Sequence, residues 1–125
     1  MSLEPASVAA KLASKLAPLG KSAIRVLLGL NDVVRLLAAV ERDVKRSPVI
    51  PHGKHALVWG RIEGQRADPE ILSCLNAYLT RGDFAAARAK LYVRFGQLLR
   101  FDDPAIDDQR IVALVVRSIG QGKHR

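Results

Sequence analysis

Apolar residues recur at every third or fourth position along most of this chain, which is the spacing of one face of an α-helix. The first such run extends from Pro5 to Ala17 and ends at Pro18. The next run, residues 21–46, is long enough for one helix, but Gly29 and the pair Asn31-Asp32 can end one helix and cap another. We therefore expect a break or kink near these residues.

The second half of that run predicts a core helix with a basic outer side. Its inner positions are Leu30, Val33, Leu37, Val40 and Val44. Three arginines, Arg35, Arg42 and Arg46, share the opposite side. Glu41 precedes Lys45 by one helical turn, a spacing that favours an ion pair.

Residues 47–67 are expected to form an internal loop of the domain. Ser47–Lys54 contains two prolines and a glycine, which deny the backbone a regular helical path. Residues 55–62 fit either a short helix with Trp59 and Ile62 inward or an extended segment with Leu57 and Trp59 on one face, and we favour the helix. In both cases Trp59, the only tryptophan, is expected to anchor the connection to the core.

Residues 68–100 predict a helical hairpin, because every helix end carries a matching residue. Asp68 can cap the first helix, Pro69 suits its first turn, Gly82 can adopt a left-handed conformation, and Asp83 can cap the second helix. The connection is short enough to require antiparallel packing. The expected facing stripes are Ile71, Leu72, Leu75, Tyr78 and Leu79 on the first helix, and Phe84, Leu91, Phe95, Leu98 and Leu99 on the second.

A last helix is predicted to start at Asp103-Pro104, with Ile111, Leu114, Val115 and Ile119 inward. Residues 120–125 lack apolar side chains and are expected to form a flexible tail. The pattern thus predicts an all-α fold, a single irregular helical bundle of five to six helices over residues 1–119 with a central antiparallel hairpin. A chain of 125 residues, of which 49% are apolar, suffices for one core.

Composition favours a cytoplasmic protein without a membrane-spanning segment. The single cysteine, Cys74, cannot form an intramolecular disulfide. No apolar run approaches the ~20 residues that span a bilayer. The N-terminal thirty residues contain lysines, serines and alanines with one acid, which is also typical of a mitochondrial presequence, but Pro5 and Pro18 fit the boundaries of an ordinary first helix better.

The chain is basic, with 20 Lys and Arg against 12 Asp and Glu and a net charge of +8. The candidate anion-binding or partner-binding face consists of Lys11, Lys15, Lys21, Arg25, Arg35, Arg42, Arg46, Lys90 and Arg94. Convergence of these residues would create a footprint for phosphate backbones or anionic lipid, and residues 6–28 can also form an amphipathic helix on a membrane surface. The alternative is a set of solvated helix backs that keep the protein soluble.

No residue pattern predicts catalysis, a cofactor or a metal. His52 and His55 have a spacing that can place two imidazoles on one metal ion, and Cys74 is a third donor, but a fourth ligand is lacking. Asp102, Asp103, Asp107 and Asp108 precede a helix, where carboxylates cap free N–H groups. An enzyme would require a site assembled from distant residues, such as one of these histidines beside the aspartate cluster. We expect no enzymatic activity.

The segment from Asp68 to Leu72, followed by residues 79–84 and 87–99, resembles a helical hairpin of the N-terminal helical domains of bacterial NACHT-type and related STAND nucleotidases. It is also similar to half a tetratricopeptide motif, but no second copy follows at that period, which argues against a solenoid. The resemblance implies a module of a longer switch protein that mediates assembly and has no nucleotide-binding residues of its own.

The expected function is therefore a non-enzymatic protein–protein interaction or oligomerisation module, with a protein partner or a second copy of the chain as its ligand. The alternative is a small basic nucleic-acid-binding protein that uses its Lys and Arg helix faces.

Overall fold

The computed structural model describes residues 30–122, and the fold is all-α over this range, as the sequence predicts. Its helices are α3 (Leu30–Arg46), α4 (His55–Glu63), α5 (Pro69–Arg81), α6 (Phe84–Leu98) and α7 (Asp108–Gly122), and residues 30–122 contain no strand. The helix expected over Pro5–Ala17 and the residues before a break at Gly29 lie outside the described residues.

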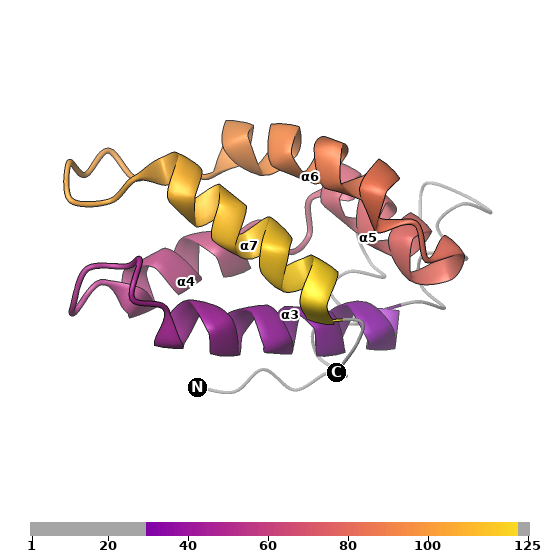
Figure 1. Cartoon of the computed structure of the whole chain (residues 1–125), viewed down its shortest axis with the longest axis horizontal. Coiled ribbons are helices and arrows are strands. Elements are labelled where there is room, and N and C mark those ends of the chain that lie inside the picture. The colour runs from indigo at the N-terminus through magenta and orange to yellow at the C-terminus, as the bar shows by residue number, and fades with distance from the viewer. Residues whose placement is uncertain (1–29, 123–125) are drawn as a thin grey trace.

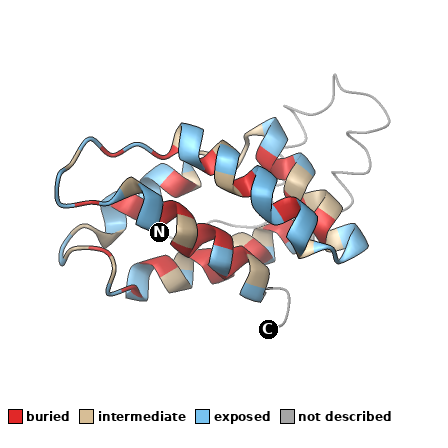
Figure 2. Ribbon diagram, turned by 45° about the horizontal axis from the view of Figure 1, so that its top comes forward, coloured by how far each residue is buried: buried red, intermediate tan, exposed pale blue. Residues whose placement is uncertain are grey.

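The helix α7 lies between α6 and α3 in the view of Figure 1. It contacts α3 on one side and α6 on the other, while α5 packs against α6 and α3, and α4 packs against α3. All five helices contribute side chains to one hydrophobic cluster. Buried positions lie on the sides that face neighbouring helices, and exposed positions lie outward (Figure 2).

On α3, Val33, Val40 and Val44 are buried as predicted, and Arg35, Arg42 and Arg46 are exposed. The inner stripe runs through Leu36, however, whereas Leu37 is only half-buried at its edge. Three helices, α4, α5 and α7, pack on α3, so its buried side also takes in Leu36 and Ala39. Glu41 and Lys45 form the expected ion pair, at 2.6 Å.

The predicted hairpin is confirmed. The Asp68 carboxylate accepts a hydrogen bond from the Ile71 amide at 3.1 Å, and the Asp83 carboxylate accepts one from the Ala86 amide at 3.2 Å. Gly82 has φ of +76°, the left-handed conformation that glycine adopts without steric cost. The buried side chains of the two helices are Ile71, Leu72, Leu75 and Tyr78 on α5, and Ala87, Leu91 and Phe95 on α6. Leu79, Phe84 and Leu98 are half-buried against this core.

Residues 47–67 differ from the expected internal loop because they contain α4. The favoured helical interpretation of residues 55–62 is confirmed, with Trp59 and Ile62 buried. The Trp59 indole N–H donates to Glu63 Oε2 at 3.0 Å, so burial leaves its polar atom satisfied. The segment thus consists of α4, which is anchored to the core, and one short connection on each side of it.

The predicted start of the last helix at Asp103-Pro104 is wrong, because α7 begins at Asp108. The Asp103 carboxylate accepts from the Ala105 amide at 2.9 Å and forms a turn, and Asp102 has φ of +52°. The Asp107 carboxylate caps α7 by accepting hydrogen bonds from the Gln109 and Arg110 amides, at 3.1 and 3.3 Å. Burial of Phe101 and Ile106 holds this turn against the core and delays the helix.

The expected tail at residues 120–125 is also corrected, because α7 continues to Gly122. Ile119 is fully buried, and the Tyr78 hydroxyl donates to the Gly120 carbonyl at 3.2 Å. The hydrogen bond from Tyr78 of α5 accompanies the extension of the helix beyond its last apolar side chain. Residues 123–125 lie outside the described residues.

A candidate interaction groove on the helical hairpin

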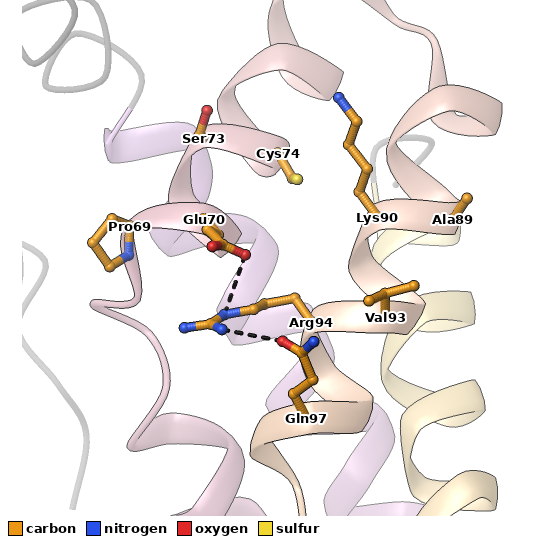
Figure 3. A pocket seen from close by; sticks show the side chains of 9 residues that line it. All are labelled: Pro69, Glu70, Ser73, Cys74, Ala89, Lys90, Val93, Arg94 and Gln97. Atoms are coloured by element: carbon orange, nitrogen blue, oxygen red, sulfur yellow. Dashed lines mark hydrogen bonds and ion pairs between the residues drawn. The ribbon is translucent and has the colours of Figure 1, made fainter.

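A groove of ≈ 910 Å³ lies between α5 and α6 on the outer side of the hairpin. Both helices contribute side chains to it (Figure 3). Its lining consists of Pro69, Glu70, Ser73, Cys74, Ala89, Lys90, Val93, Arg94 and Gln97.

The groove exists because small side chains face outward where the two helices meet. Ser73, Cys74 and Ala89 leave room that larger residues would fill, and a neighbouring hollow of ≈ 140 Å³ continues past Ala77 and Ala86 toward the turn. The distance at which helices pack depends on the side chains between them, so this surface permits close approach of a further helix.

Val93 stands on one side of the groove with 63% of its surface exposed. Within residues 30–122, Leu57 on α4 is the other large apolar residue with high exposure, at 50%. An isolated exposed apolar side chain is ordinary, but one beside an open groove is typical of a binding surface.

Arg94 fixes the lower end of the groove and is not a free cation. Its guanidinium donates to both carboxylate oxygens of Asp68, at 3.0 and 2.7 Å, and lies 3.4 Å from Glu70. It also donates to Gln97 at 3.1 Å (Figure 3). The hydrogen bond with Arg94 lowers the pKa of Asp68, and the same bond raises the pKa of Arg94. Arg94 therefore ties α6 to the start of α5 while it also lines the groove.

Lys90 is exposed at the other end and makes no ion pair with the described residues. Its neighbour across the groove, Cys74, is half-buried, and burial raises the pKa of this thiol more strongly than the positive charge of Lys90 lowers it. The thiol is thus protonated at neutral pH, a state that is a poor nucleophile.

The remaining candidate basic residues do not join Lys90. Arg35, Arg42 and Arg46 lie on α3, at the opposite edge of the described fold from α6 (Figure 1). Arg46 instead shares a hollow of ≈ 230 Å³ with Arg117 of α7 and with Asp43. The proximity of Arg46 and Arg117 cannot be predicted from helical spacing, because the two residues lie on different helices. Lys11, Lys15, Lys21 and Arg25 lie outside the described residues.

One histidine candidate, His55, and three aspartate candidates, Asp103, Asp107 and Asp108, have structural partners. The His55 ring donates from Nε2 to the Ser47 carbonyl at 2.8 Å, since a carbonyl only accepts. Asp103 pairs with Lys54, whose hydrogen bond lowers the pKa of this carboxyl. The Asp108 carboxylate accepts from the Phe101 amide at 3.3 Å. Residues 30–122 contain no group of three or more His, Cys, Asp or Glu arranged to hold a metal ion.

Comparison of the chain with protein-family models, with curated proteins and with solved structures gives no match. Over the described part of the chain, no helix has the length and apolar character required to cross a membrane.

Replacing Asp68 by alanine tests the ion pair that holds Arg94 at one end of the groove. The variant loses a helix cap, worth about 1 kcal/mol, and the Arg94 pair in addition. Because folding lowers the pKa of Asp68 below its ordinary 3.8, its stabilisation is complete above that pH and is lost as the pH falls through the lowered value. Urea unfolding of the wild type and Asp68→Ala at neutral pH and below pH 3.8 should show a difference that shrinks in acid.

Asp83→Ala is the matched control, because Asp83 caps α6 in the same way and makes no ion pair within residues 30–122. It should destabilise less than Asp68→Ala at neutral pH. Equal losses in the two variants would contradict a stabilising role for the Asp68–Arg94 pair.

Proposed function

We propose that the chain is a non-enzymatic protein-interaction module and that the outer side of the α5–α6 hairpin is its binding surface. The observation that carries this proposal is the open groove with Val93 exposed on its wall. Apolar contacts in such a groove supply affinity for a helical segment of a partner, and charged residues at its ends fix the register.

The groove suits the binding of a protein better than catalysis on a small-molecule substrate. Its charged groups are either tied into the fold, as Arg94 is by Asp68, or solvent-exposed, as Glu70 and Lys90 are. The Cys74 thiol has its pKa raised, whereas a nucleophilic thiol requires a lowered one. The same surface would serve assembly if the chain is part of a larger STAND-type switch protein, as the resemblance of its hairpin implies.

A photo-crosslinking amino acid placed at position 93 tests the proposal in cells that naturally express the protein. We expect protein adducts from position 93 and few from the matched position 57, which is similarly exposed but lies on α4. Mass spectrometry identifies the crosslinked peptides. Equal yields at the two positions, or an absence of protein adducts at position 93, would overturn the proposal.

The alternative function, nucleic-acid binding, is favoured by a different observation, the meeting of Arg46 and Arg117 in one hollow. Asp43 lines the same hollow and opposes an anion there. Anisotropy titration with labelled duplex and single-stranded DNA decides between the two. Binding that weakens steeply as salt is added and depends on Arg46 and Arg117 would support the alternative.

A further inference from the structure

We propose that the occupant of the α5–α6 groove is the same groove of a second copy of this chain, related by a two-fold axis. This inference rests on the proposed function and names its partner. In such an isologous contact the same patch serves both subunits and must complement itself in shape and charge.

The shape of the hairpin is self-complementary. Val93 projects from α6 with 63% of its surface exposed, and the part of the groove lined by Ser73, Cys74 and Ala89, called the hollow below, lies beside it. A two-fold rotation places Val93 of each subunit over the hollow of the other. Two α5–α6 hairpins would then pack as a four-helix arrangement, in which short side chains allow the helices to approach closely.

The charges of the groove are also self-complementary. Its lining carries three charged residues, Glu70, Lys90 and Arg94, of which Arg94 is closely paired with Asp68. Glu70 has 69% of its side chain exposed and touches Arg94 at 3.4 Å, and Lys90 makes no ion pair with the described residues.

Lys90 and Glu70 extend from different helices and reach different levels of the groove (Figure 3). A two-fold axis that lies in the interface and runs perpendicular to the line from Lys90 to Glu70 exchanges these two positions. In that arrangement Lys90 of one subunit faces Glu70 of the partner subunit, and the pair occurs twice. A nucleic acid would instead meet a single lysine beside the exposed Glu70 carboxylate, which favours a protein of this same composition.

Sedimentation velocity of the purified full chain, from low to high micromolar concentration, tests the dimer. We expect the wild type to dimerise as its concentration rises. Val93→Glu buries a carboxylate in each hollow and should abolish dimerisation, whereas the matched variant Leu57→Glu should not change it. Circular dichroism establishes that both variants remain folded.

Charge reversal tests the orientation. Lys90→Glu and Glu70→Lys each place like charges together twice and should weaken dimerisation roughly tenfold or more. The double variant Lys90→Glu/Glu70→Lys restores opposite charges and should recover the wild-type dimer constant within about threefold.

This inference would be overturned by a wild-type chain that stays monomeric at high micromolar concentration. It would also be overturned by a Val93→Glu variant that dimerises as strongly as the wild type. A crosslink from position 93 to residues 1–29 of the same chain, or a double variant as weak as the singles, would overturn it as well. Crosslinks from position 93 to a different protein, together with a monomeric pure chain, would refute the dimer and leave the proposed function standing.

Discussion

Trp59→Ala should lower the free energy of unfolding by about 3–5 kcal/mol, the usual cost of deleting a large aromatic side chain from a core. Trp59 is only 7% exposed and belongs to the central hydrophobic cluster. It attaches α4 to the other helices, and typical domains are stable by only about 5–15 kcal/mol. Urea unfolding followed by helical circular dichroism measures the loss.

Removal of the indole leaves no buried charge without a partner, because Glu63 still accepts from Arg66 at 3.2 Å. The loss therefore reports packing. Trp59→Phe, which keeps most of the apolar area but not the N–H group, should cost less than half as much as Trp59→Ala.

Leu57→Ala is the matched control two positions away on α4. Leu57 is 50% exposed, so its truncation should change the free energy of unfolding by no more than about 0.5 kcal/mol. Similar losses for Trp59→Ala and Leu57→Ala would mean that α4 is not anchored through Trp59.

The parts of this fold that the sequence predicts correctly are those set by neighbours in the chain. Asp68, Gly82 and Asp83 act through amides and dihedral angles within a few residues of themselves, so their effect is local and readable. The apolar spacing of α5 and α6 likewise reports one side of each helix.

The errors arise where tertiary contacts decide. Asp103-Pro104 has the same form as Asp68-Pro69. The helix nevertheless starts only at Asp108, because the preceding turn is held by the buried side chains of Phe101 and Ile106. At the other end, α7 continues beyond its last apolar residue because the Gly120 carbonyl accepts a hydrogen bond from Tyr78, a residue 42 positions earlier in the chain. Contacts over such separations leave no periodic trace in the sequence.

The candidate site divides in the same way. The positions of Lys90 and Arg94 on the outer side of the hairpin follow from helical spacing, but their different environments do not. The partner of Arg94 is Asp68, 26 residues away, and helical spacing does not reveal this pairing. Which outward side chains are small enough to leave a groove is visible in the sequence only once the two helices are aligned.

Gly120→Ala should destabilise the protein by about 1–2 kcal/mol, although alanine is the better helix former by about 1 kcal/mol. A Cβ atom at this position would lie 2.6 Å from Cε2 and 2.7 Å from Cζ of Phe84. The Phe84 ring is held against Tyr78, with ring centroids 5.1 Å apart, so it cannot move without losing that contact. Overpacking of this kind costs about 1–3 kcal/mol, more than the helix propensity returns.

Gly96→Ala supplies the matched control, because Gly96 lies within α6 and an added Cβ would meet no atom within 4 Å. That variant should gain about 0.5–1 kcal/mol from helix propensity. In a Phe84→Ala background the obstructing ring is absent, so Gly120→Ala should become neutral or stabilising. Thermal and urea unfolding of this double-mutant cycle test the reversal of sign. If Gly120→Ala stabilises the wild type as Gly96→Ala does, the Phe84 ring moves freely, and close packing against Phe84 does not explain the glycine at position 120.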